Sequence, residues 1–155
     1  MSVRTGLGVD THRFAEGRTL VLGGVEIPHM RGLAGHSDAD VLAHAITDAV
    51  LGAADMGDIG QHFPDTDPAF KNADSLALLR EVVTLVSAEG WSIEHVDATV
   101  VMERPKLAPY RAAIAARLRQ AVGASVSVKA TTGEGMGFVG REEGVAALAV
   151  ATLVR

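Results

Sequence analysis

Apolar residues recur at helical spacing in three stretches of the chain. In the first stretch they run from Val41 to Ala53, and the pattern stops near Gly57. The second stretch covers 75–89 and the third covers 110–122, and a glycine follows each of them, which is a typical helix C-terminal signal. Ser37 is predicted to cap the first helix, with Asp40 at the capping-box position three residues later. The pattern therefore predicts three helices.

Four segments read as strands, at 3–9, 96–102, 126–130 and 145–154. Two shorter apolar runs, 20–22 and 25–27, flank Gly23-Gly24 and predict a tight hairpin. The segment 145–154 is apolar on both faces, so both of its sides need a cover. We expect helices to cover one side and a neighbouring subunit to cover the other.

The order of these elements predicts an α/β fold of the two-layer, α+β-like kind. We expect a four-stranded mixed sheet, three helices on one of its faces and a small N-terminal hairpin. The segments 58–71 and 133–144 are predicted to be loops, since they are rich in proline and glycine respectively. A length of 155 residues favours one domain that covers 1–155.

The composition narrows the chemistry. No cysteine is present, so a metal site here must use nitrogen and oxygen ligands. The same absence, together with an N-terminus that lacks signal-peptide features, fits a cytoplasmic protein. No apolar run is long enough for a membrane span. The net charge of −5 argues against nucleic-acid binding, and any phosphorylated ligand would have to be neutralised locally.

Two groups of residues have metal-ligand spacing. Asp10 and His12 are two apart in a predicted strand, so their side chains point the same way. Asp40, His44 and Asp48 are four apart on the first helix and form one stripe. Three ligands with an open fourth position are typical of catalytic zinc. A polar strand end and a solvated helix face remain the ordinary alternatives.

A glycine loop follows the strand 126–130. Its backbone N–H groups and the hydroxyls of Thr131 and Thr132 suit a diphosphate, and Glu134 suits a hard cation such as Mg²⁺. Arg104-Pro105-Lys106 offers two cations on a rigid backbone. An ordinary strand connection and solvated surface charges are the alternatives for these two segments.

Taken together, several blocks of the chain resemble one family, the 2-C-methyl-D-erythritol 2,4-cyclodiphosphate synthases of the non-mevalonate isoprenoid pathway. These blocks are Gly6-Leu7-Gly8-Val9-Asp10-Thr11-His12-Arg13-Phe14, His36-Ser37-Asp38-Ala39-Asp40-Val41-Leu42-Ala43-His44-Ala45, Gly57-Asp58-Ile59-Gly60, Phe63-Pro64-Asp65-Thr66-Asp67-Pro68, Pro105-Lys106, Lys129-Ala130-Thr131-Thr132 and Gly137-Phe138-Val139-Gly140-Arg141-Glu142-Glu143-Gly144. Two departures from the family pattern are Gly135, where lysine is common, and Glu103-Arg104 before Pro105.

The resemblance implies a homotrimer with an active site at each subunit interface. It implies Zn²⁺ on Asp10, His12 and His44, with Asp48 as the outer partner of a ligating histidine, and Mg²⁺ or Mn²⁺ on Glu134. Thr132 is expected to take part in catalysis. The methylerythritol phosphate is expected to contact His36, Ser37, Asp58, Ile59, Gly60, Phe63 and Asp65. The cytidine diphosphate is expected to contact Pro105, Lys106, Leu107, Ala108, Ala130, Thr131 and Thr132. Phe138 and Arg141 are the match to a trimer cavity that takes isoprenoid diphosphates.

The implied reaction converts 4-diphosphocytidyl-2-C-methyl-D-erythritol 2-phosphate into the cyclic diphosphate and CMP. One alternative is a zinc-dependent phosphohydrolase that uses activated water. Another is a non-enzymatic module with structural zinc, which the lack of cysteine and of a fourth ligand disfavours.

Overall fold

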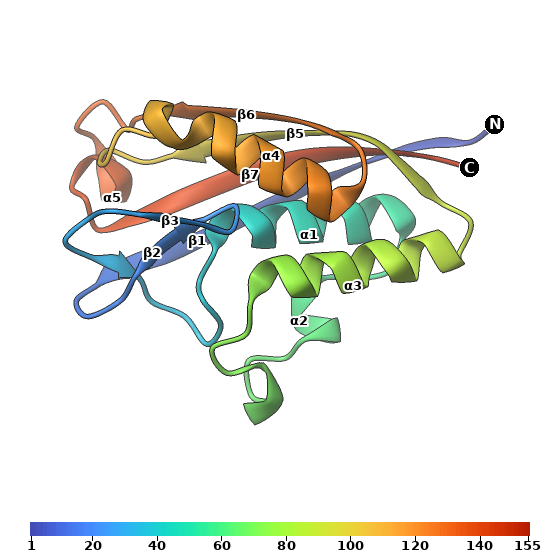
Figure 1. Cartoon of the computed structure of the whole chain (residues 1–155), viewed down its shortest axis with the longest axis horizontal. Coiled ribbons are helices and arrows are strands. Elements are labelled where there is room, and N and C mark those ends of the chain that lie inside the picture. Colours follow the sequence, from blue (N-terminus) through green and yellow to red (C-terminus); the bar gives the residue numbers. More distant parts are fainter.

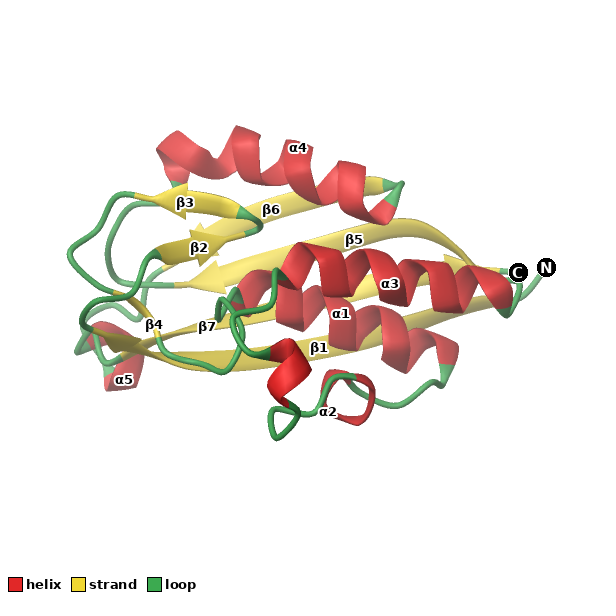
Figure 2. Ribbon diagram, turned by 60° about the horizontal axis from the view of Figure 1, so that its bottom comes forward, coloured by secondary structure: helices red, strands yellow, loops and turns green.

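The chain forms two layers, a twisted mixed sheet and a set of helices that lie on one face of it (Figures 1 and 2). The computed structural model describes all residues from 1 to 155. The strands are β1 (Val3–Ala15), β2 (Leu20–Leu22), β3 (Val25–Ile27), β4 (Gly32–Leu33), β5 (Ser92–Val101), β6 (Ser125–Thr131) and β7 (Gly144–Val154). The helices are α1 (Val41–Ala54), α2 (Ile59–His62), α3 (Ser75–Ala88), α4 (Arg111–Val122) and α5 (Gly137–Gly140), with 3₁₀ turns η1 (Pro68–Phe70) and η2 (Ala108–Tyr110).

The main sheet has the strand order β4-β1-β7-β5-β6, and β2 and β3 pair separately as the predicted hairpin. β7 pairs antiparallel with both β1 and β5, whereas β5 and β6 are parallel. The mixed α/β sheet is confirmed, but it has five strands where the sequence predicted four. The additional strand is the two-residue β4, which pairs with the end of β1 through Phe14–Leu33 and Ala15–Gly32.

The end of β1 and the structure of two predicted loops differ from the prediction. β1 continues to Ala15 instead of ending near residue 9, because its polar second half stays paired with β7 as far as Arg13–Gly144. Its alternation is polar on both faces there, so the apolar pattern gave no reason to extend the strand. The segments predicted as loops contain the one-turn helices α2 and α5.

Close contact between α1 and β1 fixes the position of the first helix. A side chain at Gly8 would place its Cβ 1.8 Å from the Ala45 carbonyl oxygen, and one at Gly6 would lie 2.1 Å from the Ala49 oxygen. Glycine in the strand and alanine in the helix therefore let the two backbones approach closely. The approach brings the first turns of α1 over the middle of β1, where Asp10 follows Gly8.

The sheet face that carries no helices is apolar and open in the single chain. Its exposed side chains include Leu7 and Val9 of β1 and Leu148 and Val150 of β7. Their opposite neighbours on β7, such as Ala147 and Ala149, are buried under the helices. One side of the last strand thus has the helical cover that its sequence predicts, while the other side has no cover within this chain.

Asp40, and not Ser37, caps α1. Its carboxylate accepts from the Ala43 N–H, as an N-cap does, and also from the N–H groups of Gly23 and Gly24 in the β2–β3 turn. The side chain is fully buried, and this burial raises the pKa of Asp40 to about 6 against the opposing effect of those hydrogen bonds. Asp40 therefore joins the hairpin to α1 and does not belong to a solvated stripe with His44.

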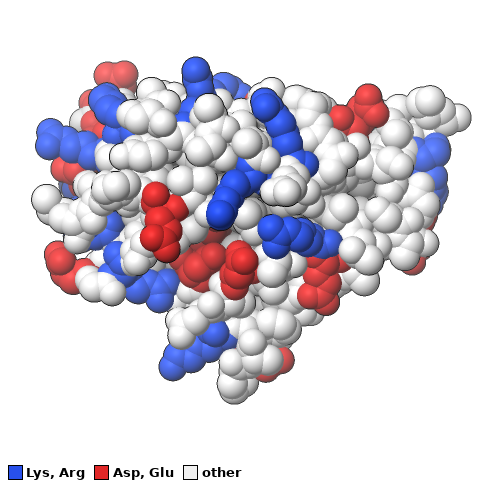
Figure 3. Space-filling view, in the orientation of Figure 1, with Lys and Arg blue, Asp and Glu red and all other residues white.

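The surface in Figure 3 has blue and red side chains interspersed over the helical face. None of the helices combines the length and the apolar character that crossing a bilayer requires.

Candidate active site

Three side chains from two elements meet beneath the first turn of α1. Asp10 and His12 of β1 point to the helical side of the sheet, and His44 of α1 points down toward them. The Asp10 Oδ2 atom lies 2.8 Å from His12 Nε2 and 3.0 Å from His44 Nδ1, and the two nitrogen atoms are 3.2 Å apart. The strand spacing therefore does bring Asp10 and His12 together, and the helix supplies the third donor.

Both imidazole rings are held from behind by oxygen atoms. His12 Nδ1 lies 2.7 Å from the Ala34 carbonyl oxygen, and His44 Nε2 lies 2.8 Å from Ser75 Oγ. Burial alone would raise the pKa of Asp10, but the two histidines outweigh it and lower that pKa to about 2. Burial would likewise lower the pKa of His12, but hydrogen bonding to Asp10 outweighs it and raises that pKa above the ordinary value.

The donor set fits a divalent transition metal. A carbonyl oxygen only accepts hydrogen bonds, so the neutral His12 ring carries its hydrogen on Nδ1 and can present its Nε2 lone pair to a metal ion beside Asp10 and His44. A cluster of acceptor atoms this close is stable only with a cation or a proton among them. Tetrahedral zinc with nitrogen ligands at about 2.0–2.1 Å keeps its ligand atoms about 3.3 Å apart, close to the separations seen here.

The three candidate ligands lie in a cleft of about 400 Å³, which we call the His44 cleft. Besides Asp10, His12 and His44, the sequence prediction named six residues that also line it: His36, Ser37, Ile59, Gly60, Phe63 and Asp65. Gly35, Pro64, Phe70 and Leu78 complete the lining. The cleft thus has a floor of three candidate metal ligands and an apolar wall around Phe63 and Phe70.

Asp58 and His36 both make hydrogen bonds to the backbone of this chain. Asp58 caps α2 by accepting from the Gln61 N–H at 2.9 Å, and it does not line the His44 cleft. His36 lines the cleft while its Nε2 lies 2.9 Å from the Asp67 carbonyl oxygen.

Asp48 is not the outer partner of His44, contrary to the prediction. Its Oδ1 accepts from the Ile59 N–H at 2.7 Å, so it ties α1 to the start of α2. Ser75, at the start of α3, takes the position behind His44 instead. Burial is the main cause that raises the pKa of Asp48, followed by the nearby Asp58 and Asp10 carboxylates, while the Ile59 N–H opposes the shift.

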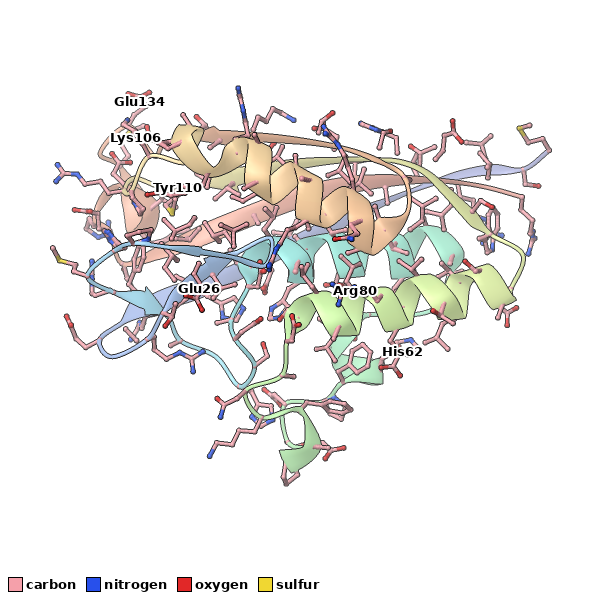
Figure 4. The ribbon with its side chains drawn as sticks, viewed as in Figure 1. Glu26, His62, Arg80, Lys106, Tyr110 and Glu134 are labelled. Carbon is pink, nitrogen blue, oxygen red and sulfur yellow. The ribbon has the colours of Figure 1, made fainter.

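A second cavity, of about 170 Å³, lies between β6 and the segment before α4; we call it the Lys106 cavity. Every residue predicted to contact the cytidine diphosphate lines it, together with Met102: Pro105, Lys106, Leu107, Ala108, Ala130, Thr131 and Thr132. Lys106 and Glu134 lie at the same end of the molecule, while His62 lies on the opposite side beside α3 (Figure 4). The predicted nucleotide residues and the predicted zinc ligands therefore line different cavities of one chain, and Glu134 lines neither of them.

The glycine loop after β6 is held by Glu103. The Glu103 carboxylate accepts from the N–H groups of Gly133 and Gly135, at 2.8 and 3.2 Å, and the Glu134 N–H donates to Thr132 Oγ1. These three N–H groups are thus occupied, which corrects the hypothesis that this stretch of backbone cradles a diphosphate. The Glu134 carboxylate itself belongs to an exposed residue with a φ of +52°.

Phe138 and Arg141 line neither the His44 cleft nor the Lys106 cavity. Phe138 lines a shallow hollow of about 240 Å³ with Thr11, His12, Arg13, Glu143 and Gly144. Arg141 approaches Glu143, with 3.5 Å between its guanidinium nitrogen and a carboxylate oxygen.

Sequence reasoning missed the supporting roles of Ala34, Ser75 and Glu103. Their contacts join residues 22, 31 and 30 positions apart in the chain, and no local motif encodes such pairs. The one local signal for Ser75 was its place next to Asp74, a typical N-cap residue, at the predicted start of a helix.

Comparison with known proteins agrees with this geometry. The family model described as the YgbB family matches residues 3–154. A 2-C-methyl-D-erythritol 2,4-cyclodiphosphate synthase of Syntrophobacter fumaroxidans is 59% identical over 154 residues, which are 97% of each chain. A bifunctional enzyme IspD/IspF of Anaeromyxobacter dehalogenans is 62% identical over 156 residues, and this chain spans only 40% of its length.

Among solved structures, a 2C-methyl-D-erythritol-2,4-cyclodiphosphate synthase in a CDP-bound form aligns with a TM-score of 0.89 and 39% identity. The alignment covers 97% of this chain and all of the other. A match to the family model along nearly the whole length, supported by identities near 60%, establishes the family. The chain therefore belongs to the YgbB family, together with the 2-C-methyl-D-erythritol 2,4-cyclodiphosphate synthases.

Proposed function

We propose that residues 1–155 act as one cyclodiphosphate synthase domain in non-mevalonate isoprenoid biosynthesis. The substrate is 4-diphosphocytidyl-2-C-methyl-D-erythritol 2-phosphate, and the products are 2-C-methyl-D-erythritol 2,4-cyclodiphosphate and CMP. The observation that carries the proposal is the Asp10/His12/His44 cluster on the floor of a cleft, in a chain nearly 60% identical to synthases of that name. Its ionised substrate does not cross membranes, so we place the enzyme in the cytoplasm, where that substrate is retained.

Two cations would be held by this chain. Asp10, His12 and His44 would hold Zn²⁺ or a similar transition metal, and Glu134 would hold Mg²⁺ or Mn²⁺ with the diphosphate. Bound there, the cations neutralise the crowded phosphate oxygens and polarise the reacting phosphorus. The lack of a fourth protein ligand leaves room for a substrate oxygen.

The residues of this chain then bind and orient the substrate. His36, Ser37 and Asp65 offer polar contacts to the methylerythritol phosphate in the His44 cleft, and Phe63 shields it from water. Lys106, Thr131 and Thr132 receive the cytidine diphosphate in the Lys106 cavity. Thr132 lies two residues before Glu134, and its Oγ1 accepts from the Glu134 N–H, which supports a part for it in the reaction beside the proposed Mg²⁺ ligand.

The reaction joins two ends of one molecule. An oxygen of the 2-phosphate attacks the β-phosphorus, the bond from that phosphorus to the oxygen of the α-phosphate breaks, and CMP leaves with the electron pair. Both the attacking and the leaving group are already ionised phosphates at neutral pH, so no strong general base is assigned. Holding the substrate bent supplies a proximity effect of up to about 7–11 kcal/mol.

The active site is proposed to be completed by a neighbouring subunit in a homotrimer. The proposed zinc ligands and the nucleotide residues line separate cavities, and we propose that one substrate joins the His44 cleft of one chain to the Lys106 cavity of its neighbour. The open apolar sheet face around Leu7, Val9, Leu148 and Val150 is available for such an assembly. In this trimer, Phe138 and Arg141 are proposed to face a central cavity that takes isoprenoid diphosphates.

Product analysis tests the function against the phosphohydrolase alternative. The purified chain is incubated with the substrate and both metals in ¹⁸O-labelled water, and the products are read by phosphorus NMR and mass spectrometry. We expect a cyclic diphosphate without ¹⁸O, together with an equal amount of CMP. A linear product that carries ¹⁸O would instead establish hydrolysis.

Asp48 provides a test of how α2 shapes the cleft. Replacing Asp48 with alanine removes the acceptor of the Ile59 N–H, and loss of one such hydrogen bond costs about 0.5–1.5 kcal/mol. We expect KM for the substrate to rise about 3- to 10-fold while kcat changes less, measured from CMP release. Asp48→Asn retains an acceptor oxygen and is expected to keep KM near that of the wild type; an equal rise in both variants would contradict the role.

Metal binding is expected to weaken in acid. Protons compete with the metal for His12 Nε2. Burial lowers the pKa of this imidazole, but its hydrogen bond with Asp10 outweighs the burial and raises the pKa above the ordinary value. Affinity for zinc should therefore reach its plateau only above about pH 6.5, the ordinary imidazole value, and fall about tenfold per pH unit below the raised pKa. Titration with a coloured chelator between pH 5.5 and 8.5 measures this; constant affinity over the range would contradict it.

A further inference from the structure

Behind His44, a row of polar side chains leads away from the metal cluster into the protein. His44 Nε2 lies 2.8 Å from Ser75 Oγ, and the Ser75 hydroxyl is in hydrogen-bond contact with Asp38 Oδ1. Ser75 is 1% exposed, so water does not compete for its hydroxyl. The row runs from His44 in the first turn of α1 to Ser75, the first residue of α3, and then to Asp38 in the loop before α1.

The direction of each hydrogen in this row follows from what each group can do. A carboxylate accepts hydrogen bonds, and Asp38 already accepts from the Ser75 N–H at 3.0 Å and the Asp40 N–H at 3.1 Å. The single hydroxyl hydrogen of Ser75 therefore goes to Asp38. Ser75 Oγ is left with lone pairs toward His44, so His44 must carry its hydrogen on Nε2 and present the Nδ1 lone pair to Asp10 and His12.

The neighbouring groups agree with this assignment. Ser37 Oγ lies 3.1 Å from the same His44 nitrogen and 3.4 Å from Ser75 Oγ, and it accepts from the Ala39 N–H. It can therefore accept from His44 or donate to Ser75 without reversing the row. His12 also has one ring nitrogen free for a metal, but there the backbone decides which one, because its Nδ1 hydrogen goes to the Ala34 carbonyl oxygen.

We propose that Ser75 and Asp38 are positioning residues that fix His44 in the Nε2–H tautomer, so that its Nδ1 is the metal-binding atom. The proposal rests on the metal site of the proposed function. Groups that orient a ligating histidine in this way are worth about 10- to 100-fold in metal affinity. His12 is set by the backbone and is insensitive to side-chain replacement, whereas His44 depends on two side chains from outside its own helix.

Two measurements on the full chain test the proposal, and neither uses activity. Zinc affinity is measured by chelator competition for the wild type, Ser75→Ala and Asp38→Asn. The tautomer of His44 is read from long-range proton–nitrogen NMR spectra of the zinc-loaded wild type, in which the ion rather than a proton occupies the space among the three ligand atoms. Ser87→Ala, an exposed serine on the same helix, is the matched control.

We expect the Nε2–H tautomer for His44 in the wild type, zinc affinity about 10- to 100-fold lower in Ser75→Ala and Asp38→Asn, and wild-type affinity in Ser87→Ala. An Nδ1–H tautomer in the wild type, or unchanged zinc affinity in both variants, would overturn the proposal even though the wild type binds zinc. A wild type that binds no zinc would instead remove the metal site on which the proposal rests. The NMR result on the wild type stands even if either variant fails to fold.

Discussion

Replacing His44 with alanine is expected to lower kcat for cyclisation by about 10³-fold, with the substrate and both metals at saturating concentrations in the assay. The variant loses one of three candidate metal donors and leaves only Asp10 and His12 as protein ligands. The fold is expected to survive, since the ring lies at the floor of an open cleft. CMP release gives the rate, and elemental analysis gives the zinc content.

The matched control for this substitution is His29→Ala, because His29 lies against Phe14 outside the His44 cleft. That variant is expected to keep the wild-type zinc content and rate. Near-normal turnover by the His44 variant in the absence of bound zinc would show that cyclisation does not depend on this cluster.

Replacing Gly8 with alanine is expected to destabilise the protein by at least about 3 kcal/mol and to abolish metal binding together with activity. The new Cβ would lie 1.8 Å from the Ala45 carbonyl oxygen and 2.7 Å from the Ala49 N atom. Both are backbone atoms of α1, so no side-chain rotation relieves the overlap. The helix must move away from β1, and His44 moves with it, away from Asp10 and His12.

Gly52→Ala is the control, because Gly52 lies on the exposed side of the same helix with no atom within 4 Å of the new Cβ. Alanine favours a helix over glycine, so this variant is expected to gain roughly 0.5–1 kcal/mol. Urea unfolding measures both changes. Equal stability of the two variants would contradict the role given to the contact between α1 and β1.

The sequence predicted the parts of this molecule that depend on local pattern. Helical spacing from Val41 onward placed α1, and Gly23-Gly24 between two apolar runs placed the β2–β3 hairpin. The two-residue spacing of Asp10 and His12 put them on one face of a strand, where the structure has them. Each of these depends on the geometry of a single element, and that geometry is fixed by a few neighbouring residues.

The parts that were missed depend on contacts between distant segments. Asp40 was predicted to share a polar stripe with His44 and Asp48, yet it is buried because the hairpin turn packs onto the start of α1 and needs an acceptor. Ser75 replaces Asp48 behind His44 because α3 begins beside the cleft. Glu103 was noted only as a departure from the family pattern, whereas its carboxylate holds the loop around Glu134. Spacing along one element carries no information about such partners.

The proposed function depends on one metal ion that Asp10, His12 and His44, brought together by β1 and α1, would hold against the substrate. A crystal structure of the zinc-loaded protein with CDP, measured at the zinc absorption edge, tests it most directly. We expect one strong anomalous peak per chain, bonded to Asp10 Oδ2, His12 Nε2 and His44 Nδ1. Fully loaded crystals with no peak among these three atoms, or with the peak at other residues, would contradict it.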